Sequence, residues 1–549
     1  NVKRVIATAS VDYRFWFLPD LRANMNVSYD NSKGEGTVDI PGNASFAFNP
    51  DTGGGVDNEY SETKRNELFE FYLNYGKEAG PHKFDLMAGY SWQRFFFDKH
   101  ELNADIAHTP GIVNEKFESG ELFLLSLYGR LNYSFQNKYL LTLTLRRDAS
   151  SRFSPDKRWG LFPAAALAWK VIEGGTGTVN NLKLRLGYGV TGQQDIGNFY
   201  QYLPRYTFSL DNARYQFGDE FVTTLRPEGY DANIQWEETT TYNVGLDYGI
   251  LDDRISGAIE FYIRKTDGLL NRVPIPAGTN LTNFLDTNVG SLENKGVEIT
   301  INATPVRTAQ WRWDVGVNVT RNKNEITKLI ASDDPNFLGV KVGGIAGGVG
   351  SLIQIHSVGY PASSFFVFEQ VYDQNGLPVE GLYVDRTGDG VVNSDDMYQY
   401  KNPAPDVFLG FNTNVSYGNF DFSLAGRANL GGYVYNNVQS TAAWSNLYHP
   451  NNFLINLPTS INETQFQNPQ FFSDHFVQNG SFLRLDHITA SYRAPALFDN
   501  KINATFSATL QNPLLITDYI GLDPEVVNGI DNNIYPRTRT FLIGVNASF

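Results

Sequence analysis

Apolar and polar residues alternate along many long segments of the chain. In the last segment, 540–549, the odd positions are apolar up to the terminal Phe549, and most even positions are small or polar. In 254–264 the odd positions are again apolar, while Arg254, Glu260 and Arg264 lie on the other face. A period of two predicts β-strands, and the apolar face indicates that one side of each strand contacts hydrocarbon while the other contacts water.

About seventeen segments share this alternation, and many are longer than ten residues. They occur near 4–18, 20–30, 65–76, 82–97, 120–135, 138–148, 160–171, 181–190, 238–250, 253–265, 294–305, 309–322, 405–417, 419–433, 481–494, 501–512 and 537–549. A soluble β-sandwich gives the same alternation, but it does not give such long strands joined by very short turns.

The connections between these segments alternate in length. Short turns fall at 136–137, 251–253, 307–308 and 418–419. Long insertions without a clear pattern occupy 31–63, 98–118, 191–236, 266–293, 323–404 and 434–480. Short turns on one side and long loops on the other are typical of barrels in a bacterial outer membrane, with the turns in the periplasm. We therefore predict an all-β fold, a transmembrane antiparallel β-barrel over 1–549, with these insertions as extracellular loops.

Composition agrees with this prediction. The 549 residues are 42% hydrophobic and 14% aromatic, and no stretch approaches the roughly 18 uncharged apolar residues of a membrane-spanning helix. Rings of aromatic residues at the two bilayer interfaces would account for the aromatic content. The net charge of −15 argues against a nucleic-acid partner, because phosphate binding needs a basic surface. Cysteine is absent, and a closed barrel needs no disulfides.

One acidic segment, 385–396, has the spacing of a calcium-binding loop. Its oxygen-bearing positions are Asp385, Thr387, Asp389, the backbone of Val391, Asn393 and Asp396. A glycine at the sixth position, Gly390, allows the sharp turn that brings such oxygens together. Thr at the third position and Asp at the twelfth weaken the match, so an acidic turn held by its own backbone is the alternative. The expected role of calcium is to stabilise a loop.

No catalytic arrangement is evident. The chain has no cysteine, no nucleophile elbow around a serine, and seven scattered histidines without metal-ligand spacing. We therefore expect that the protein is not an enzyme and needs no cofactor beyond that possible structural calcium.

A set of motifs runs through the chain in order. In the first part they are 138–141 (KYLL), 147–153 (RDASSRF), 159–164 (WGLFPA), Trp169, 182–185 (LKLR), 191–193 (TGQ) and 236–237 (WE). Further along they are 243–247 (NVGLD), 288–290 (NVG), 294–298 (NKGVE), 482–485 (FLRL), 523–525 (DPE) and 535–536 (YP). With these motifs the chain resembles the SusC/RagA family of TonB-linked outer-membrane transporters over its whole length.

The resemblance implies a fold and a set of partners. A family barrel has 22 strands around a plug, preceded by a signal peptide and a TonB box, and none of these precedes Asn1. We therefore expect the C-terminal part of such a barrel, without the plug and the first strands. The implied function is TonB-dependent import of a bulky nutrient, an oligosaccharide or oligopeptide, across the outer membrane. The implied partners are a SusD-like surface lipoprotein, TonB with ExbB and ExbD acting through the plug, and the lipid bilayer.

Two other classes compete with this interpretation. A passive porin or adhesin barrel would fit the loop lengths but not the ordered motifs, and a secreted β-rich enzyme lacks catalytic groups. The substrate-binding residues are unknown from the sequence, although the aromatic rings of Trp236, Tyr200 and Trp444 could stack on sugars. Phe549, a terminal aromatic on an alternating strand, resembles the signal read by the outer-membrane assembly machinery.

Overall fold

The structure, a computed structural model, describes the chain except residues 111, 198, 209–213, 275–281, 283, 331–336, 349, 449–452, 496–501 and 549. Seventeen long strands belong to one hydrogen-bonded sheet. They are β1 (Val2–Arg14), β2 (Leu21–Ile40), β3 (Val56–Ala79), β4 (His82–Asn103), β5 (Asn114–Phe135), β6 (Tyr139–Ser150), β7 (Trp159–Ile172), β8 (Val179–Gln193), β13 (Glu237–Ile250), β14 (Ile255–Pro274), β15 (Phe284–Arg307), β16 (Trp311–Lys328), β23 (Val407–Tyr417), β24 (Phe420–Leu430), β27 (Phe482–Arg493), β28 (Asn503–Thr517) and β30 (Thr540–Ser548). Each corresponds to one predicted segment, so the all-β prediction is confirmed.

Two compact units make up the chain. Unit 1 comprises 1–169, 187–241 and 266–289, and unit 2 comprises 170–186, 242–265 and 290–549. In unit 1, each strand from β1 to β7 pairs antiparallel with the next along the chain. The β2–β3 ladder runs without a shift from Leu21 opposite Tyr75 to Ile40 opposite Val56. These strands extend about ten residues further into the predicted loop 31–63 on each side.

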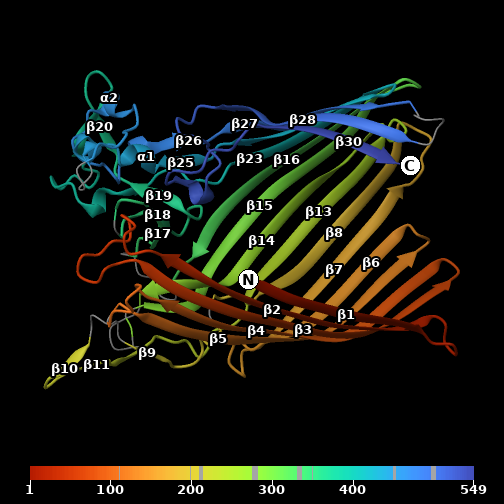
Figure 1. Cartoon of the computed structure of the whole chain (residues 1–549). Helices are drawn as coiled ribbons and strands as arrows, with labels where there is room; N and C mark the ends of the chain where they lie inside the picture. The colour runs from red at the N-terminus through yellow and green to blue at the C-terminus, as the bar shows by residue number, and fades with distance from the viewer. Residues whose placement is uncertain are drawn as a thin grey trace. The chain divides into compact units, whose positions relative to one another are not determined.

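Unit 2 continues in the same manner. Strands β15, β16, β23, β24, β27, β28 and β30 pair antiparallel in that order. The long strands of this unit are drawn in green to blue in Figure 1. Register shifts occur at Gly426 in β24 and between Leu485 and His487 in β27. Such bulges bend a strand locally and re-aim the side chains beside them.

The short turns have the geometry that a tight hairpin needs. Gln136 and Asn137 join β5 to β6 with φ angles of 53° and 52°. Two consecutive residues with positive φ are characteristic of a type I′ turn, whose twist matches that of the flanking strands. Gly418, between β23 and β24, has a φ of 55°. The predicted turns at 136–137 and 418–419 are therefore confirmed.

Apolar side chains cover one face of the strands and are exposed there. In β30, Phe541 is 78% exposed, Ile543 90% and Val545 63%. The other face of the sheet is polar: across β8, β13 and β14 in unit 2, Arg185 bonds to both carboxylate oxygens of Asp247 and also contacts Glu260. A mainly apolar exposed face opposite a polar face is what a membrane-spanning sheet requires.

Aromatic rings gather where the strands reach the short turns. In unit 1, Tyr139 stacks on Trp169 with ring centroids 6.2 Å apart. In unit 2, Trp311 and Tyr417 are 4.3 Å apart. Aromatic residues favour the level of the lipid head groups, so these rings mark one edge of the apolar band.

The long loops contain short elements that the sequence pattern did not predict. In unit 1 these are β9 (Tyr206–Phe208), β10 (Tyr215–Phe217), β11 (Glu220–Val222) and β12 (Leu225–Pro227). In unit 2 they are β17 (Val340–Gly344), β18 (Leu352–His356), β19 (Ser364–Val367), β20 (Gln370–Tyr372), β21 (Pro378–Tyr383), η1 (Ser394–Asp396), β22 (Tyr398–Gln399), β25 (Tyr433–Asn436), α1 (Asn437–Ser440), η2 (Trp444–Leu447), α2 (Ile461–Thr464), η3 (Asp474–Phe476), β26 (Val477–Asn479), η4 (Val527–Gly529) and β29 (Ile530–Asp531). Among the described residues, no helix is long and apolar enough to cross a membrane.

The short elements of unit 2 pack into one body, which we call the loop assembly: β17–β22, β25, β26, β29 and the helices between them. They gather at one end of the long strands of unit 2 (Figure 1). Strand β25 pairs antiparallel with β26 and parallel with β29, although β29 lies about a hundred residues further along the chain. The insertions 323–404 and 434–480, in which the sequence shows no clear pattern, therefore contain ordered short strands and helices. Segments of two to six residues are too short to show a period in the sequence.

The loop assembly has its own apolar core. Its fully buried members include Ile353, Phe365, Val367 and Tyr435, and they come from β18, β19 and β25. Tyr435 also donates a hydrogen bond to the carbonyl of Phe471. A buried core of this kind holds the loops in one arrangement, so they can present a defined surface.

Candidate functional site

Three motif residues of unit 1, Phe153, Phe162 and Trp236, pack with Ile234 in one cluster, which we call the aromatic hub. The ring of Trp236 lies 5.4 Å from that of Phe153 and 5.3 Å from that of Phe162. Its indole Nε1–H donates to the carbonyl of Arg158 at 2.9 Å. Trp236 is only 8% exposed, so little of its ring is open to a ligand. Burial among aromatic rings explains why the tryptophan is used here: it anchors the loop to β7.

Gly192 allows the hub to close. A Cβ atom at this position would lie 2.2 Å from the ring of Phe162 and 2.9 Å from that of Trp236. No side chain fits in that space, so the glycine of the 191–193 motif is required for packing. Asn288, from another motif, holds the same loop: its amide accepts the N–H of Gln235 at 2.8 Å and donates to the carbonyl of Gly268 at 2.6 Å.

A polar pocket of about 260 Å³ lies among the loops of unit 1. Its lining includes Gln201, Arg205, Arg226, Glu228 and Asp286. Gln201 donates to Asp286 at 3.1 Å, and Arg205 forms an ion pair with Glu228 at 3.1 Å. Charged and amide groups arranged this way can bind hydroxyl groups or peptide groups of a ligand.

A second pocket, of about 490 Å³, is formed by the loop assembly of unit 2. Pro378, Gln439, Glu463, His475 and Phe476 are among its lining residues. Burial lowers the pKa of His475, so its imidazole is neutral near neutral pH and can accept or donate a hydrogen bond. The lining combines apolar groups, neutral polar groups and one carboxylate, that of Glu463, so it suits an amphipathic ligand with hydrogen-bond donors.

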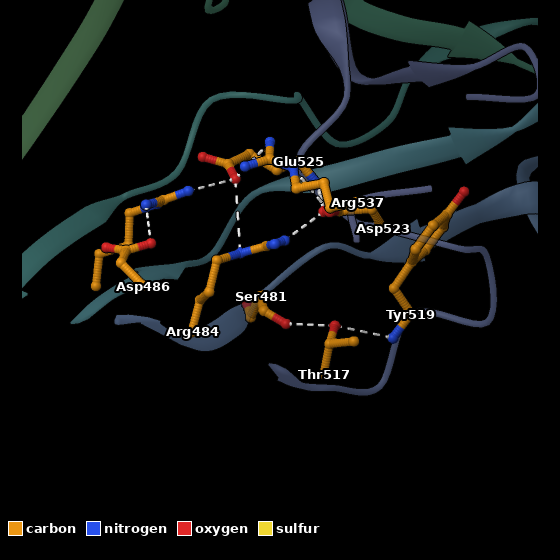
Figure 2. A network of polar contacts seen from close by, with 9 residues as sticks. Ser481, Arg484, Asp486, Thr517, Tyr519, Asp523, Glu525 and Arg537 are labelled. Atoms are coloured by element: carbon orange, nitrogen blue, oxygen red, sulfur yellow. Dashed lines mark hydrogen bonds and ion pairs between the residues drawn. The ribbon is translucent and has the colours of Figure 1, made fainter. Parts of the chain in front are cut away.

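Three motif residues near the end of the chain, Arg484, Asp523 and Glu525, belong to an arginine network in unit 2 (Figure 2). Its other members are Arg427, Asp486 and Arg537. The central pair is Arg484 and Asp523, each 3% exposed, with Nη2 and Oδ1 2.6 Å apart. Arg537 contacts Asp523 at 3.1 Å and Glu525 at 2.9 Å. Three cations and three anions balance, which is necessary because an uncompensated buried charge is costly.

This network fastens the segment after β28 to the sheet. Arg484 and Asp486 belong to β27 and Arg427 to β24, while Asp523 and Glu525 lie between β28 and β29. The contacts between β27 and this segment can be followed in Figure 2. Within the same segment, Tyr519 donates to Asp531 at 2.7 Å, and both side chains are buried. Desolvation and this bond raise the pKa of Tyr519, so its hydroxyl stays protonated.

The acidic loop that was predicted to bind calcium forms a compact turn before η1. The carboxylate of Asp396 accepts the backbone N–H groups of Arg386, Thr387 and Asn393 at 2.8 to 2.9 Å. Asp396 is fully buried. These backbone hydrogen bonds outweigh its desolvation and lower the pKa of Asp396 to about 2.

The structure brings part of the predicted ligand set together. The Thr387 hydroxyl lies 3.2 Å from the carboxylate of Asp385 and 3.1 Å from that of Asp396. Asp389 instead accepts the N–H of Val391 at 2.8 Å, and the Asn393 side chain caps η1. Among the described residues, no group of three or more His, Cys, Asp and Glu side chains is placed to hold a metal ion. The calcium site stays a prediction.

The other predicted residues are placed as follows. Trp444 begins η2 in the loop assembly and is partly buried, and Tyr200 lies beside Phe199 with ring centroids 6.4 Å apart. Phe549 falls outside the described residues. The Arg484–Asp523 pair was not predicted from the sequence. The signal that could have found it is the charged residue inside the apolar run 482–485, which indicates a buried partner.

Comparison with known proteins agrees with this geometry. The family profile described as "TonB dependent receptor-like, beta-barrel" matches residues 2–436. The chain is 41% identical to the TonB-dependent receptor SusC of Bacteroides thetaiotaomicron, over 100% of the chain and 56% of that protein. It is 30% identical to the TonB-dependent receptor P3 of Formosa agariphila, over 90% of the chain and 53% of that protein.

Solved structures share the fold. The RagAB peptide transporter matches with a TM-score of 0.77 and 22% identity, covering 99% of this chain and 62% of that chain. The chain spans about half the length of the curated relatives it matches. On the family profile and the SusC similarity, the chain belongs to the TonB-dependent receptor β-barrel family, in its SusC/RagA group.

Proposed function

We propose that the protein containing this chain imports a bulky nutrient across the outer membrane, with energy delivered through TonB. Family membership places the chain in the bacterial outer membrane. The observation that carries the proposal is the long antiparallel sheet of a TonB-dependent receptor, with short turns on one side and a packed loop assembly on the other. The outer membrane holds no nucleotide supply, so uphill uptake needs force from the inner membrane.

The substrate that we propose is an oligosaccharide or an oligopeptide. The two loop pockets, about 260 and 490 Å³, have the polar and mixed linings that either ligand would need. One structural relative is described as a peptide transporter, and the most similar of the relatives reported above is a SusC receptor. The role that we propose is transport without catalysis, with no required cofactor.

The proposed partners follow from the same relatives. A SusD-like surface lipoprotein would bind the loop side of the receptor. TonB, with ExbB and ExbD, would act through the plug of the whole protein. A rigid loop assembly supports this arrangement, because a lipoprotein cap needs a defined surface to bind.

Growth on the cognate nutrient, measured with and without TonB in cells carrying the full-length protein, tests the proposal. Active import predicts growth only when TonB is present and the inner membrane is energised. The alternative, a passive porin or adhesin, predicts that loss of TonB leaves growth unchanged. Copurification of a lipoprotein with the full-length receptor tests the partner separately, since import and capping can fail independently.

A further inference from the structure

The exposed apolar face of unit 2 carries a groove of about 540 Å³. It crosses four strands, β13 to β16. Its apolar lining is formed by Tyr242, Val244, Phe261, Ile263 and Val297. Phe261 is 55% exposed and Val244 47%, so these side chains are on the membrane-facing side, opposite Glu260 and Asp247. The groove therefore opens toward lipid.

Three cations form one end of the groove: Lys295, Arg321 and Lys323. Lys295 lies directly opposite Lys323 in the β15–β16 ladder, and Val297 lies opposite Arg321. Like charges opposite each other in a sheet are destabilising. An anion bound between them would relieve that repulsion.

Nearby carboxylates neutralise this charge only in part. Glu293 contacts Lys295 at 2.5 Å and Lys265 at 3.6 Å, and Glu325 contacts Lys323 at 2.9 Å. Among the described residues, no acidic side chain forms an ion pair with Arg321. Four cations against two carboxylates leave a net charge of +2 on this part of the face.

The position along the strand places these cations at the edge of the bilayer. From the start of β16 to Lys323, the outward-facing residues are, in order, Trp311, Trp313, Val315, Val317, Val319, Arg321 and Lys323, and Glu325 follows them. Trp313 belongs to the short-turn end, and Lys323 follows it by 323 − 313 = 10 residues. Ten residues span about 33 Å along a strand, or about 25 Å of height at a tilt of about 40°. That height equals the apolar band of an outer-membrane barrel, about 25 Å.

We propose that this groove binds a phosphate-bearing lipid of the outer leaflet. The phosphate lies on Lys295, Arg321 and Lys323, and one acyl chain lies along Val244, Phe261 and Ile263. The height worked out along β16 places Arg321 and Lys323 at head-group level, and apolar side chains line the groove beside them, so the site offers both a charged and an apolar contact to such a lipid. The bound lipid would stay attached to the outward face of β13 to β16, near the ends of the strands that lead into the long loops.

Native mass spectrometry of the full-length protein in detergent, titrated with phosphatidic acid, tests this site. Each cation near an anionic head group contributes roughly 1 kcal/mol, about fivefold in affinity. The triple variant Lys295→Gln/Arg321→Gln/Lys323→Gln should therefore bind phosphatidic acid on the order of 100-fold more weakly. A second variant, Val244→Trp, fills the apolar part without changing charge and should also weaken binding.

The matched control is Lys33→Gln. Lys33 and Lys295 have side chains 53% and 55% exposed, and each pairs with a glutamate two positions away, but Lys33 lines no part of this groove. The Lys33→Gln variant should bind phosphatidic acid as tightly as the wild type. Heat-dependent migration in electrophoresis should show that all variants are folded. Equal binding of phosphatidylcholine, displacement by inorganic phosphate alone, or unaltered binding by either groove variant would overturn the proposal.

Discussion

Replacing Arg484 with methionine removes the cation at the centre of the arginine network and leaves the Asp523 carboxylate buried. Both side chains are 3% exposed, and their polar atoms are 2.6 Å apart. Removing one partner of a buried ion pair costs roughly 3–5 kcal/mol. Because the half-exposed Arg537 stays 3.1 Å from Asp523, we expect the lower end, roughly 3 kcal/mol.

This cost should appear as local opening of the segment that the network holds. A change of roughly 3 kcal/mol corresponds to an increase on the order of 100-fold in the open population. Hydrogen exchange measured by mass spectrometry on peptides covering 518–531, in the full-length protein in detergent, reports that population directly. Local exchange is the suitable assay, because a large membrane protein does not unfold in one reversible step.

Two further variants separate the pair from its surroundings. In Arg484→Met/Asp523→Leu the buried charges are removed together, and protection should return close to the wild-type value. In Lys33→Met an exposed ion pair is lost, and exchange around that residue should change less than about fivefold. Exchange of 518–531 in Arg484→Met within threefold of the wild type would refute the reasoning, as would a double variant no better protected than the single one.

Three other outcomes follow from the loops and the chain end. The pKa of Asp396 in the folded protein, about 2, is below that of an unfolded aspartate, so the ionised carboxylate stabilises its loop fully above about pH 4 and this stabilisation is lost between pH 4 and 2. With chelator present, pepsin should therefore cut the loop faster as the pH falls over that range. The variant Asp396→Asn should abolish this pH dependence. If calcium binds, Asp385→Ala/Asp389→Ala should make protease cutting of 371–404 insensitive to calcium, whereas a wild-type loop cut equally fast with calcium and with chelator has no site. Deleting Phe549 from the full-length protein should lower the amount of inserted barrel in outer-membrane fractions, and normal surface levels would reject its role in assembly.

The long strands were predictable because each one has the same two environments along most of its length. Lipid on one face and water on the other impose a period of two on the sequence. This period can be recognised in a single strand, without knowing which strand pairs with it. The boundaries were less accurate. Strand β3 begins at Val56, where the prediction began at 65, because the strand extends beyond the membrane and both faces are then wet. Without an apolar face the alternation disappears from the sequence.

The loop assembly could not be predicted for a different reason. Its contacts join residues that are far apart in the chain, such as Tyr435 with Ile530, through strands of two to four residues. Such strands are stable only because they are buried against each other, so no local sequence pattern predicts them. Trp236 shows the same limit for a single side chain. The sequence gives its identity and its loop, while burial of its ring depends on Phe153 and Phe162.

The long-range core of the loop assembly constrains the order in which the protein can fold. Ile345, Phe365, Tyr435, Phe476 and Ile530 all contribute to that core, so it cannot close until the last of them has been placed. Closing loops of this length is slow, because the chain loses conformational entropy before the core contacts that offset this loss can form. We therefore expect the loop assembly to pack late, after the segment that carries Ile530 has reached it. A chain stalled during insertion would have unpacked loops, which a protease could cut. A partner that binds only the packed loop assembly would therefore bind only a completed receptor.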